Sequence, residues 1–530
     1  MSTYSKKYLP LIIGAACSIG IIIGGRLDYF DDSGSVFSTP NSKKKQKLTR
    51  LIDYIDYEYV DDVNTDSIVD VTVNGILKNL DPHSTYIPPE QYERVAQNMK
   101  GDFVGIGVSF YNINDTIVVI RALEDGPSER AGIKGGDRIL FANGQQLFNR
   151  NLDNDSITRQ LKGAANTKVN LKVYRKTEDR LLDFTVTRGT VPLKSVDAAY
   201  MITDDLGYIK INRFAESTYK EFKKALKNLK NQGANQLILD LRNNGGGYLS
   251  EAIKIADEFL EDDKLILFTK SKKGEIDKTF ATNAGMYENG QVYVLMNENS
   301  ASASEVVAGA LQDNDKGTIV GRRSYGKGLV QREMSLGDGS AVRLTIARYF
   351  TPTGRSIQRP YDDGKEAYFD EYLDRYENGE LEDAKNIEVA DSLKFTTPGG
   401  KVVYGGGGII PDVFVPKDTN YQSEHLNYLL RSGAMNQFTF EYIEKNRSYL
   451  NSLDKKTFVD DFEVEDQTVQ DYLSYLKEFN YNLTITEYKT LLKRYLKATI
   501  GQQLFGNTMF EKLVNQDDPL IDKVKELVEE

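Results

Sequence analysis

The chain has 530 residues, too many for a single hydrophobic core, so we expect roughly three or four domains. Its 78 acidic and 67 basic residues give a net charge of −11, which argues against nucleic acid as the main partner because phosphate binding needs a basic face. The single cysteine, Cys17, excludes an internal disulfide, so the domains depend on their cores for stability.

An apolar segment lies near the N-terminus. Residues 8–25 form an uncharged stretch of 18 residues, about the minimum that spans a bilayer as a helix. Lys6 and Lys7 precede it and three aspartates follow it, so the positive-inside rule places the body of the protein on the periplasmic, extracytoplasmic side of the inner membrane. We therefore expect residues 1–30 to be an uncleaved single-pass anchor. A cleaved signal peptide is the alternative, because Pro10 and several glycines weaken a stable span.

A polar linker and a small helical region follow. Residues 31–46 are rich in serine, aspartate and lysine, which is typical of a tether. Within residues 47–100 the apolar side chains recur at helical spacing, and we expect a second helix over 66–80. The motif LDPHSTYIPP ends this region and contains His83, one of two histidines. Because His83 lies beside a proline turn with no evident catalytic partner, we expect a hydrogen-bonded structural group.

Short strands and glycine turns characterise residues 101–190. The pattern predicts a helix over 156–161 and strands over 116–122, 169–174 and 184–187. This order, with the motifs FVGIGVSF and SERAGIKGGDRIL, resembles a PDZ domain of the type found in exported proteases.

The glycines of this region have a chemical use. In Val104-Gly105-Ile106-Gly107 they allow successive backbone amides to turn toward the terminal carboxylate of a peptide, and the next strand offers an edge to which the peptide can add. A hairpin whose glycines serve only turns is the alternative.

Strands and helices alternate from residue 206 to 350, which predicts an α/β core within residues 191–415. Thr218 and Glu221 are spaced as a capping box at the start of one helix. The strand in NQLILDLRNNGGG ends in a glycine turn, and the strand QVYVLMN leads directly into a helix that begins with three serines. Sheets of this kind have their active sites at the carboxyl ends of strands.

Ser302 is the candidate nucleophile. A hydroxyl at a helix N-terminus can attack a carbonyl while the next amide, from Ala303, points at the developing oxyanion. We expect the neighbouring Ser300 and Ser304 to be helix caps.

Lys327 is the candidate base, because both histidines lie outside the α/β segment. It is flanked by Gly326 and Gly328, which permit close approach, and burial can lower the pKa of a lysine until it acts as a neutral base. The spacing from Gly321 to Lys327 nearly matches a phosphate-binding loop. A nucleotide-binding loop is disfavoured because no hydroxyl residue follows the lysine. The chain instead continues as a strand that enters a hairpin at 337–339.

Five motifs together resemble the carboxyl-terminal processing peptidases, or tail-specific proteases, over about residues 48–415: LDPHSTY, LILDLRNNGGG, NSASASEVVAGALQD, SYGKGLVQ and ARYFTPTGRSIQ. The resemblance implies that Ser302 is the nucleophile, that Lys327 is the base and that Gln331 positions the lysine. It also implies an oxyanion hole formed by the amides of Ala303 and of Gly246 or Gly247.

Two regions have no assigned chemistry. An acidic, tyrosine-rich insertion lies between Gln358 and Gly408, and helical patterns fill residues 416–530. Packing against the core or a partner is the expectation for both, and an adaptor or self-association role is the alternative.

These observations predict a multidomain α/β protein: a membrane-anchored serine endopeptidase that recognises unstructured C-terminal tails of proteins and needs no metal or cofactor. The alternative is a catalytically silent PDZ scaffold, which would not need Ser302, Lys327 and Gln331 together. A metal hydrolase is disfavoured because two distant histidines and one cysteine leave only carboxylates as ligands.

Overall fold

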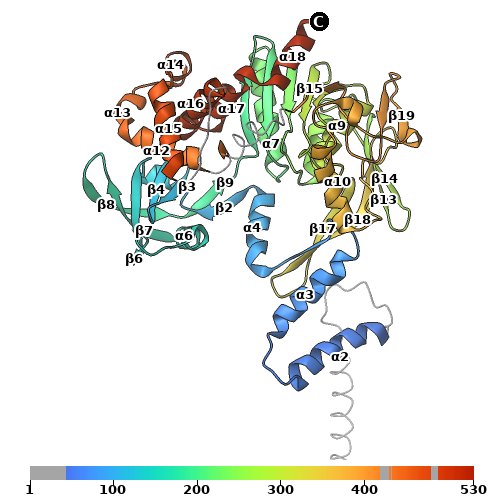
Figure 1. The fold of residues 1–530 in the computed structure, drawn as a ribbon, viewed down its shortest axis with the longest axis horizontal. Coiled ribbons are helices and arrows are strands. Elements are labelled where there is room, and N and C mark those ends of the chain that lie inside the picture. The colour runs from blue at the N-terminus through green and yellow to red at the C-terminus, as the bar shows by residue number, and fades with distance from the viewer. Residues whose placement is uncertain (1–42, 418–428, 431–432, 479–487) are drawn as a thin grey trace, which may run out of the picture. The chain divides into compact units, whose positions relative to one another are not determined.

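The computed structural model describes residues 43–417, 429–430, 433–478 and 488–530, and the chain divides into two compact units, Met1–Ile76 and Leu77–Glu530. The predicted anchor, residues 1–30, lies outside the described residues. Within the described part of the chain, no helix combines the length and the apolar character needed to cross a membrane. The first described elements are the predicted helices, α2 (Lys43–Glu58) and α3 (Thr65–Lys78) (Figure 1).

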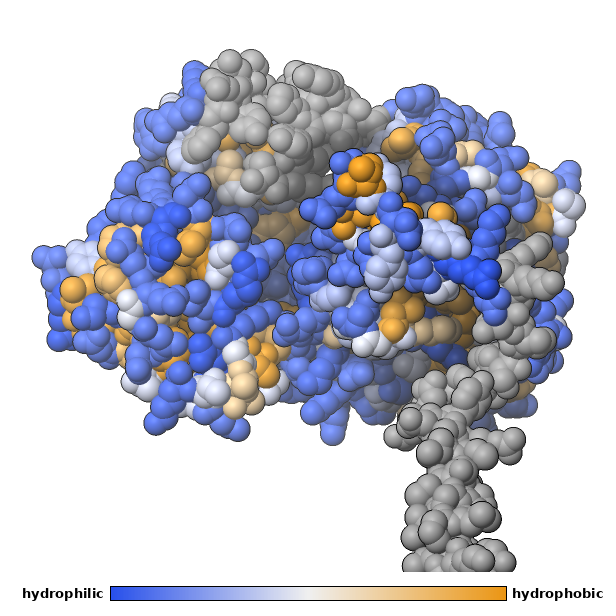
Figure 2. All heavy atoms as spheres, turned by 90° about the horizontal axis from the view of Figure 1, so that it is seen from below, coloured by the Kyte–Doolittle hydropathy of each residue, from blue (hydrophilic) through white to orange (hydrophobic). Residues whose placement is uncertain are grey.

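The face of the molecule in Figure 2 is predominantly polar where it is coloured. Figure 2 shows one face of the molecule, on which hydrophilic side chains predominate and hydrophobic side chains form separate small groups. In the N-terminal unit, Tyr57 and Val60 are among the most exposed large hydrophobic side chains.

The predicted PDZ region contains one antiparallel sheet with the strand order β3-β4-β5-β7-β8, in which β6 pairs with β5. Alternate side chains of β7 are buried, because one face of the sheet covers the core of this region. A separate pair of strands, β2 and β9, brackets the region. The elements are β2 (Asp102–Gly105), β3 (Val108–Ile113), β4 (Thr116–Ala122), α5 (Pro127–Ala131), β5 (Asp137–Ala142), β6 (Gln145–Gln146), α6 (Asn154–Leu161), β7 (Lys168–Arg175), β8 (Arg180–Thr187) and β9 (Gly189–Pro192).

The α/β core is built on a six-stranded sheet with the order β10-β11-β12-β15-β16-β21. All neighbouring strands are parallel except β10 and β11. Its elements are β10 (Val196–Met201), β11 (Leu206–Ile211), α7 (Thr218–Asn231), β12 (Gln236–Asp240), α8 (Leu249–Asp257), β15 (Gln291–Met296), α9 (Ala303–Asp313), β16 (Gly317–Gly321) and β21 (Val413–Phe414).

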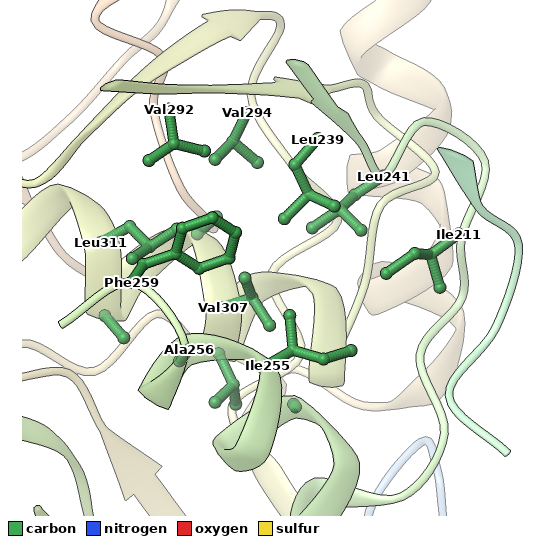
Figure 3. Close-up of a cluster of buried hydrophobic side chains, with 14 of the residues drawn as sticks. Ile211, Leu239, Leu241, Ile255, Ala256, Phe259, Val292, Val294, Val307 and Leu311 are labelled. Atoms are coloured by element: carbon green, nitrogen blue, oxygen red, sulfur yellow. The ribbon is translucent and has the colours of Figure 1, made fainter. Parts of the chain in front are cut away.

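Both faces of this sheet are buried, as expected for parallel strands. Leu239 and Leu241 pack with residues of α7, α8 and α9, and Figure 3 shows such strand side chains pointing toward Ile255, Phe259 and Val307 of these helices and their flanks. Ile238 points to the other face, where the C-terminal helix α18 (Pro519–Glu529) covers the sheet. Because successive side chains of a strand point to opposite faces of the sheet, each strand contributes to two hydrophobic cores.

A second, antiparallel sheet carries the predicted hairpin after Lys327. Its order is β1-β18-β13-β14, with β17 paired to β18. The hairpin prediction is confirmed by the pairing of β17 with β18 on either side of Gly337. The elements are β1 (Thr85–Ile87), β13 (Leu265–Ser271), β14 (Ile276–Phe280), β17 (Leu329–Ser335) and β18 (Ala341–Phe350), and α4 (Pro89–Lys100) follows β1.

The acidic insertion is folded. It contains one long helix and a small hairpin of two strands that pair with each other. The elements are α10 (Lys365–Glu377), the short 3-10 helices η1 (Ala384–Asn386) and η2 (Asp391–Leu393), and the strands β19 (Lys394–Thr396) and β20 (Val402–Tyr404).

The C-terminal region is helical, as predicted, and has its own core. It contacts the outer face of the PDZ sheet through the rings of Tyr111 and Phe440 and through an ion pair of 2.6 Å between Arg138 and Glu444. Besides α18, its elements are α12 (Ala434–Lys445), α13 (Arg447–Leu450), α14 (Lys455–Asp460), α15 (Asp466–Glu478), α16 (Lys489–Phe505), α17 (Asn507–Val514) and η3 (Asn515–Asp517).

The capping box predicted for α7 is wrong. The Thr218 hydroxyl accepts a hydrogen bond from the Ala215 amide and donates one to the Arg213 carbonyl, both outside the helix. The Glu221 carboxylate accepts the amides of Ser195 and Val196 instead of capping the helix. Tertiary contacts thus take both side chains that the local pattern assigned to the helix start.

Candidate active site

Ser302 lies at the corner between β15 and α9. Its φ of 56° is in the left-handed region, which is rare for a residue with a side chain and typical of functional sites. Its amide donates to Glu305 Oε2 at 2.7 Å. The next amide, from Ala303 in the first turn of α9, has no acceptor among the described residues. The corner therefore presents a hydroxyl and an unpaired amide side by side.

The prediction that Ser300 and Ser304 cap the helix is wrong. The Ser300 hydroxyl donates to the Leu241 carbonyl at 2.8 Å, and the Ser304 hydroxyl donates to the Asn244 carbonyl at 2.9 Å. Both acceptors belong to the segment after β12 that leads into the glycine turn. The two serines therefore fasten the Ser302 corner to that turn.

The glycine turn approaches Ser302 closely. A Cβ added to Gly246 would lie 2.9 Å from Ser302 Cβ and 3.0 Å from the Ala303 nitrogen, so no larger residue fits. The Gly246 amide already donates to Asn244 Oδ1 at 2.9 Å. The Gly247 amide has no acceptor among the described residues, so of the two predicted glycines Gly247 has the available donor.

Lys327 and Gln331 are brought together as predicted. Lys327 Nζ donates to Gln331 Oε1 at 2.8 Å, and Gln331 Nε2 donates to the His83 carbonyl at 2.8 Å. The His83 carbonyl can only accept, so it fixes the carboxamide with its oxygen toward the lysine. Ser302, Lys327 and Gln331 all line one cavity of about 530 Å³. Within the described structure no direct hydrogen bond joins Ser302 Oγ to Lys327 Nζ.

The surroundings of Lys327 lower its pKa, as a general base requires. Burial, reinforced by the positive charge of Arg343, lowers the pKa of Lys327 to about 8. Glu305 and Asp81 act in the opposite direction but do not outweigh these two effects. At this pKa roughly a tenth of Lys327 is uncharged at pH 7, far more than for a free lysine.

Glu305 joins the segments that carry Ser302 and Lys327 and was not predicted. Its buried carboxylate accepts hydrogen bonds from Ser302 N at 2.7 Å, Ser324 Oγ at 2.6 Å, Gly326 N at 2.7 Å and Lys327 N at 2.9 Å. Burial raises the pKa of Glu305, while these hydrogen bonds oppose the rise. Its position three residues after a serine, as in a capping box, is the sequence signal that could have found it.

His83 lies beside the site and is hydrogen-bonded, as expected, although its partners come from distant segments. Its Nε2 and the Tyr368 hydroxyl are 2.9 Å apart. Burial and the charge of Lys327 lower the pKa of His83 to about 3, so the ring is neutral at physiological pH. The imidazole contacts α10 of the insertion, and its backbone carbonyl serves Gln331.

The predicted carboxylate-binding loop comprises the end of β2 and the connection that follows it. Val104 and Gly105 lie in β2, paired with β9. The carbonyls of Ile106 and Gly107 accept the amides of Ser128 and Leu123, while their own amides have no acceptor in the described part of the chain. Gly107 has a φ of 72°, which favours glycine, and β3, which follows, is an edge strand.

No group of three or more His, Cys, Asp and Glu side chains that could hold a metal ion occurs among the described residues.

Comparisons with known proteins agree with the domain order. Residues 205–363 match the model of peptidase family S41, residues 104–186 match the PDZ domain, and residues 425–506 match a family of unknown function.

Two relatives are similar over most of their length. A carboxy-terminal-processing protease from Bartonella bacilliformis is 32% identical over 67% of this chain and 80% of the relative. A probable CtpA-like serine protease from Staphylococcus aureus is 32% identical over 66% of this chain and 70% of the relative. Among solved structures, a photosystem II D1 C-terminal processing protease is 24% identical over 71% of this chain and 88% of its own, with a TM-score of 0.36. The chain belongs to peptidase family S41 and is a carboxy-terminal-processing serine peptidase.

Proposed function

We propose that Ser302 is the nucleophile and Lys327 the general base of this peptidase. The observation that carries the proposal is the state of Lys327: a half-buried amine with a pKa of about 8, held by a neutral acceptor in the cavity that Ser302 also lines. Such an amine can remove a proton from a hydroxyl and later return it, which are the two tasks of a base in acyl transfer.

The chemistry follows from this arrangement. Ser302 Oγ attacks the carbonyl carbon of the scissile bond and transfers its proton to Lys327 Nζ. The amides of Ala303 and Gly247, both without an acceptor among the described residues, donate to the oxyanion that forms. The lysine then protonates the leaving amine, and an ester with Ser302 remains. A water molecule, deprotonated by Lys327, hydrolyses this ester and restores the serine.

The cavity also supports a preference for the side chain beside the scissile bond. Val306 and Leu329 are buried in its wall and, with Met99 and Leu249, make part of the lining apolar, while charged side chains such as Arg332 and Glu333 also line the cavity. Because an apolar side chain gains free energy by leaving water for such a wall, we infer that the enzyme prefers an apolar residue at this position.

We infer that the PDZ region recognises the C-terminal tail of the substrate. The unpaired amides of Ile106 and Gly107 suit a terminal carboxylate, and the edge of β3 can extend its sheet by one peptide strand. The apolar residues 8–25 and the charges around them further support an enzyme anchored in the inner membrane with its body on the extracytoplasmic side.

One experiment tests nucleophile and tail recognition together. An unstructured peptide is supplied with a free or an amidated C-terminus to the wild-type enzyme, to Ser302→Ala and to the control Ser335→Ala, which changes an exposed serine in β17. We expect no cleavage by Ser302→Ala and full cleavage by the control. Amidation removes a charge-assisted hydrogen bond, so kcat/KM of the wild type should fall about 10- to 100-fold.

Substantial cleavage by Ser302→Ala would refute the nucleophile. Equal cleavage of both peptides by the wild type would refute recognition of the C-terminus.

A further inference from the structure

Helix α10 of the acidic insertion faces the catalytic loops. It carries Tyr368 and Tyr372 one turn apart, on the same side of the helix. Tyr368 is 2% exposed, and its hydroxyl contacts His83. Neither tyrosine lines the cavity that contains Ser302 and Lys327. Both side chains therefore approach the catalytic loops from behind.

Tyr368 is linked to the base through a chain of hydrogen bonds. Its hydroxyl lies 2.9 Å from His83 Nε2, and the two rings are nearly perpendicular, with centroids 5.2 Å apart. The His83 carbonyl accepts Gln331 Nε2, and Gln331 Oε1 accepts Lys327 Nζ. The imidazole is half-buried, so loss of the tyrosine hydroxyl would leave Nε2 without its protein partner and free the His83 segment to move. The carboxamide that faces the lysine would then lose its fixed acceptor.

Tyr372 is linked to the oxyanion side of the site. Its hydroxyl donates to Asn299 Oδ1, and Asn299 Nδ2 donates to Asn243 Oδ1 at 3.0 Å. Asn299 belongs to the segment that leads to Ser302, and Asn243 begins the turn that contains Gly247. One side chain of α10 is thus linked to both segments that form the proposed oxyanion hole, to the first directly and to the second through Asn299.

Two arginines hold α10 in this place. The Arg359 guanidinium lies 4.0 Å from the centre of the Tyr368 ring, and its backbone amide donates to the Gly326 carbonyl at 3.1 Å. Arg375 Nη1, from α10 itself, donates to the Ser324 carbonyl at 2.8 Å. Both carbonyls lie in the segment just before Lys327. The helix therefore cannot shift without disturbing the segment that carries the base.

We propose that α10 is a positioning element of the active site, in which Tyr368 orients Lys327 through His83 and Gln331 and Tyr372 orients the oxyanion turn through Asn299. The proposal rests on the roles assigned above to Ser302 and Lys327. It gives the insertion a part in the reaction without any contact with substrate. Its signature is a loss of kcat with little change in KM, because the substrate cavity keeps its lining.

The test uses the full chain with single hydroxyl deletions. Tyr368→Phe keeps the ring and should lower kcat about 3- to 10-fold, the worth of one hydrogen bond, with KM within about twofold. The matched control is Tyr361→Phe, which removes a hydroxyl of the insertion that accepts from Arg348 and has no link to the site. This control should match the wild type.

A double-mutant cycle separates positioning from general support of the fold. If Tyr368 acts through Gln331, then Tyr368→Phe should cost nothing further in a Gln331→Ala background. Tyr372→Phe, on the other branch, should lower kcat by itself and combine additively with Tyr368→Phe. Should Tyr368→Phe yield little folded protein, Tyr372→Phe still tests the other branch of the proposal, the oxyanion turn, at a partly exposed position.

Wild-type kcat in both tyrosine variants would overturn the proposal, and so would full additivity of Tyr368→Phe with Gln331→Ala. Cleavage by Ser302→Ala would instead overturn the proposed function. An inactive Ser302→Ala together with unaffected tyrosine variants would therefore count against this inference alone.

Discussion

Two half-buried lysines near the ends of strands show how charged surroundings set the pKa of a lysine. Lys327 precedes β17 and donates to the neutral Gln331. Lys210, near the end of β11, donates to both oxygens of the Glu511 carboxylate at 2.9 and 3.0 Å. Burial lowers the pKa of Lys210 as well, but the charges of Asp240 and Glu511 outweigh burial and leave this pKa above its usual value.

The lesson is that burial alone does not create a base. Burial and the nearby Arg343 both act against the charge of Lys327, and among the described residues the one side-chain acceptor of its Nζ is the Gln331 amide. Lys210 connects the core to the C-terminal helix α17 as a permanent cation. The two lysines thus differ in the charges around them: Lys210 has the Glu511 carboxylate as its acceptor and Asp240 nearby, whereas Lys327 has a neutral glutamine as its acceptor and Arg343 nearby.

The largest expected effect concerns the structural lysine. Glu511→Gln would leave Lys210 with weaker compensation, and breaking a buried pair costs about 3–5 kcal/mol of unfolding free energy. Denaturant unfolding of the variant measures this loss. The matched control is Glu526→Gln in α18, which breaks a pair between exposed Lys523 and Glu526 and should have no measurable effect. Unchanged stability of Glu511→Gln would mean that water or Asp240 already suffices for Lys210.

The second-largest expected effect comes from giving Lys327 a carboxylate partner like that of Lys210. In Gln331→Glu a carboxylate faces Lys327, and an opposite charge at this distance raises a pKa by about 1–3 units. The base must be uncharged, so activity rises as pH passes the pKa of Lys327. The variant should therefore lose roughly 100-fold in kcat/KM near neutral pH for a shift of about two units and recover part of it in alkali.

The neutral variant Gln331→Leu is the control for this shift, because it removes the acceptor without adding a charge. Its pH midpoint should not rise above that of the wild type. If the pH–activity profile of Gln331→Glu had the same midpoint as that of the wild type, residue 331 would not set the charge state of Lys327.

The smallest effect tests the repulsion from Arg343. Its charge lowers the pKa of Lys327, so Arg343→Gln should move the midpoint of the pH profile upward. Arg343 is partly exposed and paired with Glu333, so the rise should be about half a pH unit or less. Arg348→Gln changes an arginine of the same strand that contacts Tyr361 instead, and should leave the midpoint in place. A downward shift in Arg343→Gln would contradict the assigned sign.

Local patterns predicted the parts of the site that one segment determines. The corner at Ser302 follows from an apolar strand that runs into a helix, and the hairpin after Lys327 follows from alternation and a glycine turn. The pairing of Lys327 with Gln331 was implied by family motifs and is seen in the structure. Each of these features lies within a few residues of its signal.

The remaining parts depend on contacts between distant segments. His83 and Gln331 are 248 residues apart in the chain, and His83 and Tyr368 are 285 apart, so no local periodicity links them. The same reason explains the errors at Ser300, Ser304 and Thr218. Their hydroxyls suit a helix start by local rules, but each has an acceptor outside the helix.

The contact between the PDZ sheet and the C-terminal helices has a consequence for domain exchange. Glu444 accepts Arg138 of the PDZ region and Arg447 of its own region, and a Cβ added to Gly136 would lie only 2.7 Å from the Arg447 guanidinium. The back of this PDZ domain is therefore shaped for these particular helices. A PDZ domain grafted from a relative would bring its own peptide groove but lose this fit. The module to transplant when changing tail specificity is the PDZ domain together with the C-terminal helices.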